Sequence, residues 1–328
     1  MSDKKINAED FSFASFDQNI PSSTTSFSRI KQNKGALIAL IVLVIMICLA
    51  FAAPIISPRD PNQQNPDNSN LPPRIAGVNI PGFRGKMKNA NGKVVDAYKE
   101  NKIPKNRTYI LGTDYLGRDL FARILYGTRL SLIIAFLAAL VDLAIGLPYG
   151  IISGWLGGTV DIVLQRLIEI ISAVPKMIIA ILLMLVLKPG LSSIILSIVF
   201  TGWIPMARLI RGQTLHLRQQ EYLQAALTMG ISPLRLTFKH LIPNLSSTII
   251  IQTMFSIPSA IFFEAFLSFI GIGIPAPNAS LGTLLSDGQK AFRFLPYQMW
   301  EPALVLCVLM LAFNFAADGL RDIFDPKV

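Results

Sequence analysis

Residues 35–57 read GALIALIVLVIMICLAFAAPIIS and contain no charged side chain. A helix of about 20 apolar residues crosses the roughly 30 Å hydrocarbon core of a bilayer, so the stretch predicts a membrane span. A cleaved signal peptide is the alternative, because Ala50-Phe51-Ala52 resembles a small-x-small cleavage site. The apolar run exceeds the roughly 7–15 residues of a signal peptide's core, which favours a transmembrane helix.

The composition agrees with a membrane protein. Of 328 residues, 52% are hydrophobic and 15% charged, and the mean hydropathy is +0.50, outside the range of ordinary soluble domains. The net charge of +10 could indicate nucleic acid as a partner, but the basic residues flank apolar segments, so membrane orientation explains them better and we expect no nucleic-acid partner. The two cysteines, Cys48 and Cys307, lie in apolar stretches, and the sequence predicts neither a disulfide framework nor a metal site.

Further apolar segments predict an all-α, polytopic protein with six spans. The later spans are expected at 130–154, 160–187, 191–205, 247–272 and 300–317. Residues 1–34 are expected to form an N-terminal tail that is either mobile or a short surface helix. Residues 58–129 are expected to form a small folded insert, residues 206–246 a loop and residues 321–328 a C-terminal tail.

Lys and Arg in short loops predict the orientation, because such loops stay preferentially in the cytoplasm. Arg29, Lys31 and Lys34 precede the first span and place the N-terminus inside. Six spans then return the C-terminus to the cytoplasm, and the basic 206–246 loop is inside as well. The basic 58–129 segment comes out external, which is acceptable because segments beyond about 60 residues translocate largely regardless of charge. We expect a multi-pass protein of the cytoplasmic (plasma or inner) membrane.

Motifs for enzyme chemistry are missing from the sequence. Gly92-Lys93 is followed by Val94 and lacks the upstream glycine of a phosphate-binding loop. No nucleophile and base, and no pair of carboxylates, form a plausible polar site. We predict a non-catalytic chain without catalytic residues.

The 206–246 loop has features of a docking element. Residues 221–230 read EYLQAALTMG, in which the first part favours a helix and Gly230 can end it. Ser232-Pro233 is a suitable cap and first residue for a second short helix. The loop therefore predicts a helix, a sharp turn and a short helix that could enter a groove on a partner. An amphipathic loop without a partner is the alternative.

Three stretches resemble the peptide-type branch of ABC importer permeases, which includes dipeptide, oligopeptide and nickel permeases. The loop resembles the EAA motif of that superfamily, with Ala225, Ala226, Gly230 and Pro243 at matching positions and with departures at Gln224 and His240. The others are LGTDYLGRDL at 111–120 and EAFLSFIGIG at 264–273. The chain is similar to the "C" permease of that branch.

The resemblance implies a type I importer fold and primary active import of peptides, with oligopeptides as the main expectation. It implies a homologous second permease, two ATPase subunits that hold ATP and Mg, an external peptide-binding protein and membrane lipid as partners, with no cofactor in this chain. It also implies coupling residues in the loop, namely Glu221, Gln224, Ala225, Ala226, Gly230 and Pro243. Import of nickel or another small solute, a secondary transporter, and a non-transporting scaffold or receptor subunit remain alternatives.

Polar residues inside predicted spans are candidates for a translocation path, because intramembrane charges are costly and face a bundle interior or water. Helical spacing predicts one stripe on the third span, formed by Asp161, Gln165, Glu169, Ser172 and Lys176. The path candidates are Asp142, Glu169, Lys176 and Glu264, of which Lys176 and Glu264 are the best for exposure to water. The alternative is that these residues seal helices together.

Overall fold

The computed structural model describes residues 33–75, 80, 82–88, 94–104 and 107–324. The tail predicted over 1–34 lies outside these residues except for Asn33 and Lys34, and so do residues 325–328 of the predicted C-terminal tail.

Helices dominate the described residues. Five helical segments are long and apolar enough to cross a membrane, namely Lys34–Phe51, Leu120–Leu156, Leu191–Arg218, Pro233–Phe269 and Tyr297–Ile323. Two further helices, α7 (Gly158–Ala173) and α8 (Lys176–Leu187), make a sixth span if the bent pair counts as one. The prediction of an all-α, polytopic protein is confirmed.

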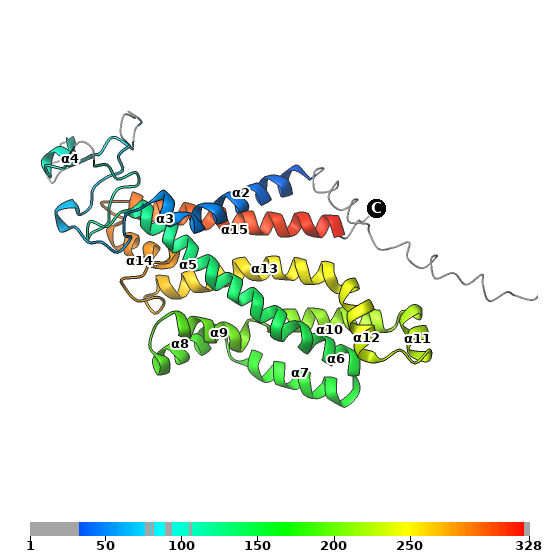
Figure 1. The fold of residues 1–328 in the computed structure, drawn as a ribbon. Coiled ribbons are helices and arrows are strands. Elements are labelled where there is room, and N and C mark those ends of the chain that lie inside the picture. Colours follow the sequence, from blue (N-terminus) through cyan, green and yellow to red (C-terminus); the bar gives the residue numbers. More distant parts are fainter. Residues whose placement is uncertain (1–32, 76–79, 81, 89–93, 105–106, 325–328) are drawn as a thin grey trace, which may run out of the picture.

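One layer of the bundle is built from the first and last helices and two central ones (Figure 1). Helix α2 (Lys34–Phe51), followed by the short α3 (Ala53–Ile56), packs on α15 (Tyr297–Phe324), and α13 (Ile242–Phe269) packs on both α15 and α5 (Leu120–Val141). Buried alanines and large aliphatic side chains from these helices form the main apolar core. Close helix packing through small residues is typical of membrane bundles.

A second contact brings α6 (Leu147–Leu156) against α10 (Ile204–Arg218). Gly146, Gly150 and Gly154 recur every four residues and share the face toward α10. A Cβ atom added at Gly150 would lie 2.6 Å from the carbonyl oxygen of Ala207. The two backbones therefore touch where no side chain fits, a packing that sequence reasoning missed.

The predicted third span is broken. Helix α7 ends at Ala173, and α8 begins at Lys176 after a bend of 73°. Pro175 stands at the break, where its missing N–H cannot continue the α7 hydrogen-bond ladder. Helix α9 (Leu191–Thr201) then leads into α10.

Several predicted boundaries were wrong, because helices extend beyond their apolar parts. Helix α5 begins at Leu120 instead of residue 130, where the Asp119 carboxylate accepts the Phe121 N–H at 3.0 Å as an N-cap. The fourth span continues past residue 205 to Arg218. The fifth begins at Pro233 rather than 247, through α12 (Pro233–Leu236) and a π-helical turn, Thr237–Leu241.

The sixth span runs from Tyr297 instead of residue 300 and passes residue 317. Sequence reasoning also missed α14 (Leu281–Ala291), which lies between the last two spans. Its start carries a capping box, in which the Ser280 hydroxyl accepts the Thr283 N–H and the Thr283 hydroxyl accepts the Ser280 N–H.

The segment between the first two spans has a small core of its own. Strands β1 (Lys86–Lys88) and β2 (Val94–Asp96) pair antiparallel with Met87 opposite Val95, and α4 (Ala97–Glu100) follows. Their apolar cluster contains Leu71, Ala97, Tyr98 and Tyr109. Because α5 begins at Leu120, this insert spans residues 57–119 rather than 58–129.

The LGTDYLGRDL stretch joins the insert to the bundle. Its Asp114 is buried and accepts the backbone N–H groups of Leu116 and Arg118 and the Arg118 Nε, the last at 2.6 Å. At the start of α15, the Gln298 amide donates to the Thr113 carbonyl at 3.0 Å. The stretch is thus a structural joint between the insert, α5 and α15.

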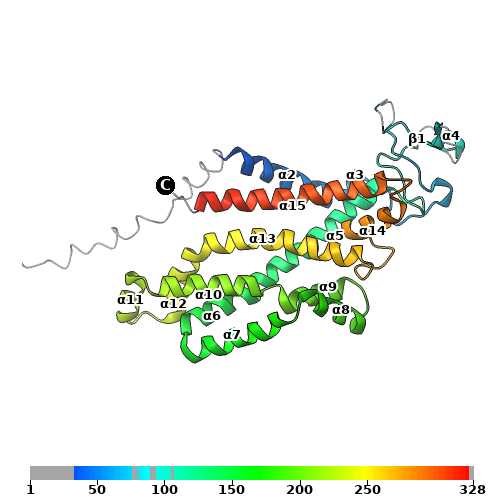
Figure 2. The ribbon, with the colours of Figure 1, turned by 180° about the vertical axis from the view of Figure 1, so that it is seen from behind.

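The two ends of the bundle differ (Figures 1 and 2). The insert and α14 lie at one end, whereas α11 (Glu221–Thr228) and α12 lie at the other. The start of α2 and the end of α15 meet at the α11 end, where the Asn33 amide donates to the Asp322 carboxylate at 3.2 Å. The chain therefore passes along the bundle an even number of times between Asn33 and Asp322.

Candidate functional site

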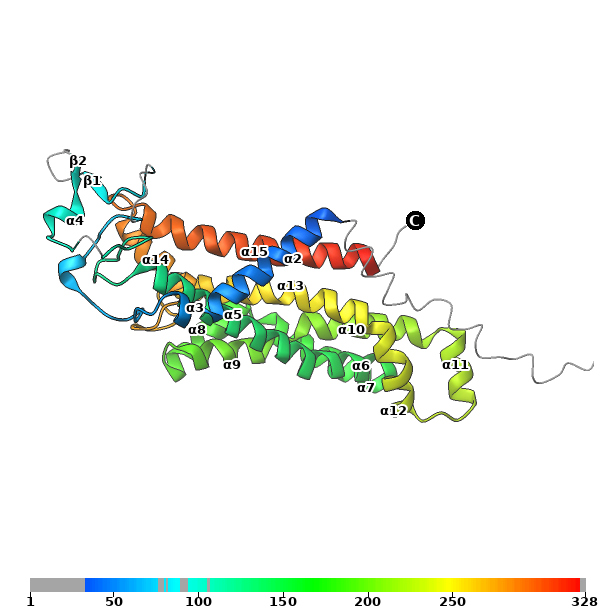
Figure 3. The same ribbon diagram turned by 45° about the horizontal axis from the view of Figure 1, so that its top comes forward.

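Residues 219–241, called here the α11–α12 segment, extend from the bundle at the end opposite the insert (Figure 3). Helix α11 ends at Thr228, and Gly230 turns the chain with a φ of +76°. This left-handed conformation costs little for glycine and roughly 1–2 kcal/mol for most other residues. Nothing lies within 4 Å of a Cβ built at Gly230, so the requirement for glycine is conformational and not steric.

The two alanines of the motif face different surroundings. Ala226 is 7% exposed and packs with Leu223 and Leu236 in a small cluster that holds α11 against α12. Ala225 is exposed on the other side of α11. The sequence pattern does not distinguish the two alanines, whereas the helix separates them, because adjacent residues point about 100° apart around a helix.

The other predicted coupling residues lie on α11 and at the start of α13. Glu221 is the first residue of α11 and is exposed, and the Gln224 amide donates to the Arg218 carbonyl at 2.8 Å. Pro243 is exposed near the start of α13. The Asn244 amide, next to Pro243, donates to the Tyr222 hydroxyl of α11 at 3.3 Å, which connects the start of α13 with α11.

Sequence reasoning missed three large apolar side chains that the α11–α12 segment exposes. Met229, Leu234 and Phe238 are 61%, 74% and 70% exposed. Arg235 and Lys239 lie beside the last two in sequence and are exposed as well. The spacing of Leu234 and Phe238 by four residues was a visible signal, since it places both on one helical face. Large exposed apolar side chains beside basic ones are typical of a surface that contacts another protein or a membrane.

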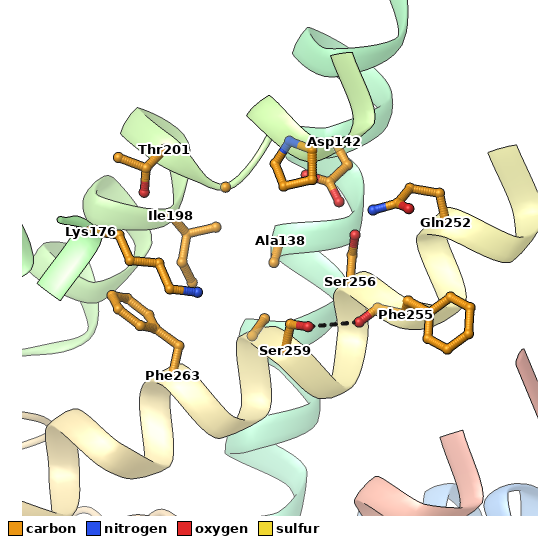
Figure 4. Close-up of a pocket in the computed structure, with 13 residues that line it drawn as sticks. Ala138, Asp142, Lys176, Ile198, Thr201, Gln252, Phe255, Ser256, Ser259 and Phe263 are labelled. Atoms are coloured by element: carbon orange, nitrogen blue, oxygen red, sulfur yellow. Dashed lines mark hydrogen bonds between the residues drawn. The ribbon is translucent and has the colours of Figure 1, made fainter. Parts of the chain in front are cut away.

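A second candidate site is a cavity of about 220 Å³ between α5, α8, α9 and α13 (Figure 4). Two of the four predicted path residues, Asp142 and Lys176, line it. Its other polar groups come from Thr201, Gln252, Ser256 and Ser259, and Gln252 and Ser256 escaped sequence reasoning because single Gln and Ser residues in an apolar span carry no strong signal.

Asp142 begins a π-helical turn, Asp142–Gly146, that interrupts the long second span. Such turns are rare and occur frequently at functional sites. Gln252 and Ser256 of α13 point toward the Asp142 carboxylate (Figure 4). The carboxylate therefore has a polar setting inside the membrane span.

Lys176 lies across the cavity, with its ammonium 5.2 Å from the centroid of the Phe263 ring. It is exposed at the start of α8, after the break at Pro175. The prediction of one continuous stripe from Asp161 to Lys176 is therefore wrong, because the two residues lie on different helices.

The remaining stripe residues contact neighbouring helices. Asp161 accepts hydrogen bonds from Ser153 of α6 and Arg211 of α10. Gln165 donates to Ser153 at 3.1 Å, and Ser172 accepts from Arg208 at 3.0 Å. These contacts match the alternative that part of the stripe seals helices together.

The last two path candidates lie away from the cavity. Glu169 is exposed on α7 and pairs with Arg166 at 2.6 Å. Glu264 was expected to face water and instead is fully buried, where it accepts hydrogen bonds from Ser131 of α5 at 2.9 Å and Ser268 at 2.7 Å. Two hydroxyl donors compensate for its burial, so Glu264 ties α5 to α13.

Known proteins similar to this chain are membrane components of transporters. Residues 146–328 match the family described as "Binding-protein-dependent transport system inner membrane component", and residues 24–73 match the "N-terminal TM domain of oligopeptide transport permease C". The dipeptide transport system permease protein DppC of Lactococcus lactis is 44% identical, over 92% of this chain and 90% of that protein. The oligopeptide transport system permease protein OppC of Bacillus subtilis is 40% identical, over 92% and 88%.

A solved structure of the methionine ABC transporter MetNI, in an inward-facing conformation, contains a chain of similar fold. The TM-score is 0.51 at 17% identity, covering 62% of this chain and 97% of that one. This likeness shows a type I importer permease fold. Together with the family match over residues 146–328, it follows that the chain belongs to the family of binding-protein-dependent transport system inner membrane components.

Proposed function

We propose that this chain is a permease subunit of an ATP-driven importer that carries peptides, chiefly oligopeptides, into the cell. The observation that supports peptides most directly is the similarity to dipeptide and oligopeptide permeases over 92% of the chain at 40–44% identity. Within the complex, this subunit moves substrate, and it holds neither the ATP nor the Mg of the partner ATPases.

The proposed partners are a homologous second permease, two ATPase subunits, an extracytoplasmic peptide-binding protein and the surrounding lipid. The α11–α12 segment docks on an ATPase subunit. Its exposed Met229, Leu234 and Phe238 supply apolar contact area, in the manner of a helix held in a groove. Closure of the ATPase pair moves this segment and, through α10 and α13, the spans that line the cavity.

Uptake by the assembled transporter is the direct test of the proposal. Proteoliposomes that hold this chain with its permease, ATPase and binding-protein partners are expected to accumulate a labelled oligopeptide only with ATP and Mg. A variant ATPase that binds but does not hydrolyse ATP is the control, and it should show no accumulation. Accumulation driven by an ion gradient without ATP would identify a secondary transporter instead.

The proposed topology places both termini and the α11–α12 segment in the cytoplasm and the insert outside. The positive-inside rule supports it, and the meeting of Asn33 with Asp322 at the α11 end requires the two to share one side. Protease added to intact protoplasts is expected to cut at the exposed Arg107, in the insert, and to spare the α11–α12 segment. Cleavage of the insert only in inside-out vesicles would reverse the orientation.

A further inference from the structure

The cavity between α5, α8, α9 and α13 holds two charges of opposite sign that do not pair with each other. Among the described residues, neither Asp142 nor Lys176 has an ion-pair partner, although both line the same 220 Å³ space. Charges within a membrane span are expensive and occur where they serve a pathway or a ligand. Two such charges in one cavity suit a ligand that carries both signs.

The two ends of the cavity differ in chemistry (Figure 4). At one end, the Asp142 carboxylate and the Ser256 hydroxyl offer oxygen acceptors to an ammonium group, and the Gln252 amide turns its nitrogen toward the carboxylate. At the other, the Lys176 ammonium beside the Phe263 ring offers a donor to a carboxylate. The apolar side chains of Ala138 and Ile198 lie between them, and Ala260 also lines the cavity.

We propose that this cavity binds the charged ends of zwitterionic peptides, with Asp142 and Ser256 receiving the terminal ammonium and Lys176 receiving the terminal carboxylate. The inference rests on the proposed function and adds which groups of the peptide the permease contacts. The cavity is smaller than the roughly 300–1,000 Å³ of sites that enclose a whole ligand, so the two ends of a peptide enter it while the residues that join them loop out of the cavity. Asp142 and Lys176 are then specificity-determining residues of the permease.

Thiol labelling within the cavity tests the proposal. In a chain with Cys48→Ser and Cys307→Ser, cysteine replaces Ser259, which is exposed and lines the cavity. The complete transporter without its binding protein is placed in proteoliposomes, and the labelling rates of a cationic and an anionic methanethiosulfonate are compared. Asp142→Asn is expected to lower the cation-to-anion ratio of rates and Lys176→Met to raise it. Lys188→Met, which removes a lysine outside the cavity, should leave the ratio unchanged.

Peptide protection completes the test. A saturating tetrapeptide with free ends is expected to slow labelling, whereas the same sequence acetylated and amidated at its ends is not. Asp142→Asn or Lys176→Met should weaken protection at least about tenfold in peptide concentration, as expected for loss of a charge-assisted contact.

Three results would overturn the inference. The first is equal protection by free and blocked peptides, and the second is no protection by the free peptide. The third is recovery, in a charge-swapped Asp142→Lys and Lys176→Asp variant, of the uptake that the single variants lose, because it would show that the two residues form an ion pair with each other. ATP-driven uptake by the parent transporter is measured in parallel and distinguishes these results from failure of the proposed function. Uptake without peptide protection would contradict only the proposed binding of peptide ends in the cavity.

Discussion

Replacing Ala225 with aspartate is expected to abolish ATP-driven uptake and to leave the subunit in the membrane at close to its normal level. Ala225 is exposed on α11, outside the spans, so the new carboxylate does not disturb the bundle. In the proposed docked state, this face of α11 is covered by the ATPase subunit. A charge buried there without a partner costs about 3–5 kcal/mol, which lowers affinity by a factor of about 100 or more.

The neighbouring alanine provides the matched comparison. Ala226→Asp places its carboxylate against Leu223 and Leu236, so we expect it to unfold the α11–α12 segment itself and to increase proteolysis of that segment. Ala225→Ser keeps a small neutral side chain and should transport normally. The measurements are membrane level, peptide uptake and co-purification of the ATPase subunits. If the Ala225→Asp variant co-purifies with the ATPase subunits and takes up peptide normally, this face of α11 does not contact the ATPase.

The number and type of spans could be predicted from the sequence, whereas their ends could not. The length of an uninterrupted apolar run matches the thickness of the bilayer core. It does not indicate how far the helix continues into polar surroundings. Helix α5 begins where the Asp119 side chain caps it, ten residues before the apolar part that hydropathy detected from residue 130. Helix α10 likewise continues to Arg218, and its Arg and Gln residues favour a helix nearly as well as leucine does.

The candidate site divides along similar lines. The turn at Gly230 follows from local chain chemistry, and it was predicted from the residues around it. Asp142 and Glu264 look alike in sequence, each a lone acid in an apolar span. Only tertiary packing distinguishes them. Asp142 lines a cavity, whereas Glu264 accepts hydrogen bonds from the hydroxyl groups of Ser131 and Ser268.

The broken stripe on the third span had a visible warning. Helical spacing connects Asp161 with Lys176 only if the helix is continuous, and Pro175 directly precedes Lys176. The 73° bend turns α8 away from α7, so Lys176 reaches the cavity while Asp161 binds Arg211. A proline within a periodic pattern should divide the pattern before faces are assigned.

The contact between α6 and α10 carries the second large expected effect. Gly150→Leu is expected to remove most of the folded subunit from the membrane, because the side chain has no space to enter. Its Cβ alone would lie 2.6 Å from the Ala207 carbonyl oxygen and 2.8 Å from the Ile210 Cβ. Overpacking a tight core costs about 1–3 kcal/mol when side chains can adjust, and here backbone atoms of α10 must move, so the cost lies at or above that range.

Gly212→Leu is the matched control for this prediction. Gly212 lies on α10 itself, but nothing lies within 4 Å of a Cβ built there, so leucine projects into open space. Fluorescence-detected size-exclusion chromatography and the midpoint of thermal unfolding in detergent measure both variants. We expect Gly212→Leu to behave as the parent and Gly150→Leu to give aggregated or degraded protein. Equal behaviour of the two variants would show that α6 and α10 do not pack through this glycine face. The position of Arg211, which forms an ion pair with Asp161, depends on that close approach of α6 and α10 and would then need another explanation.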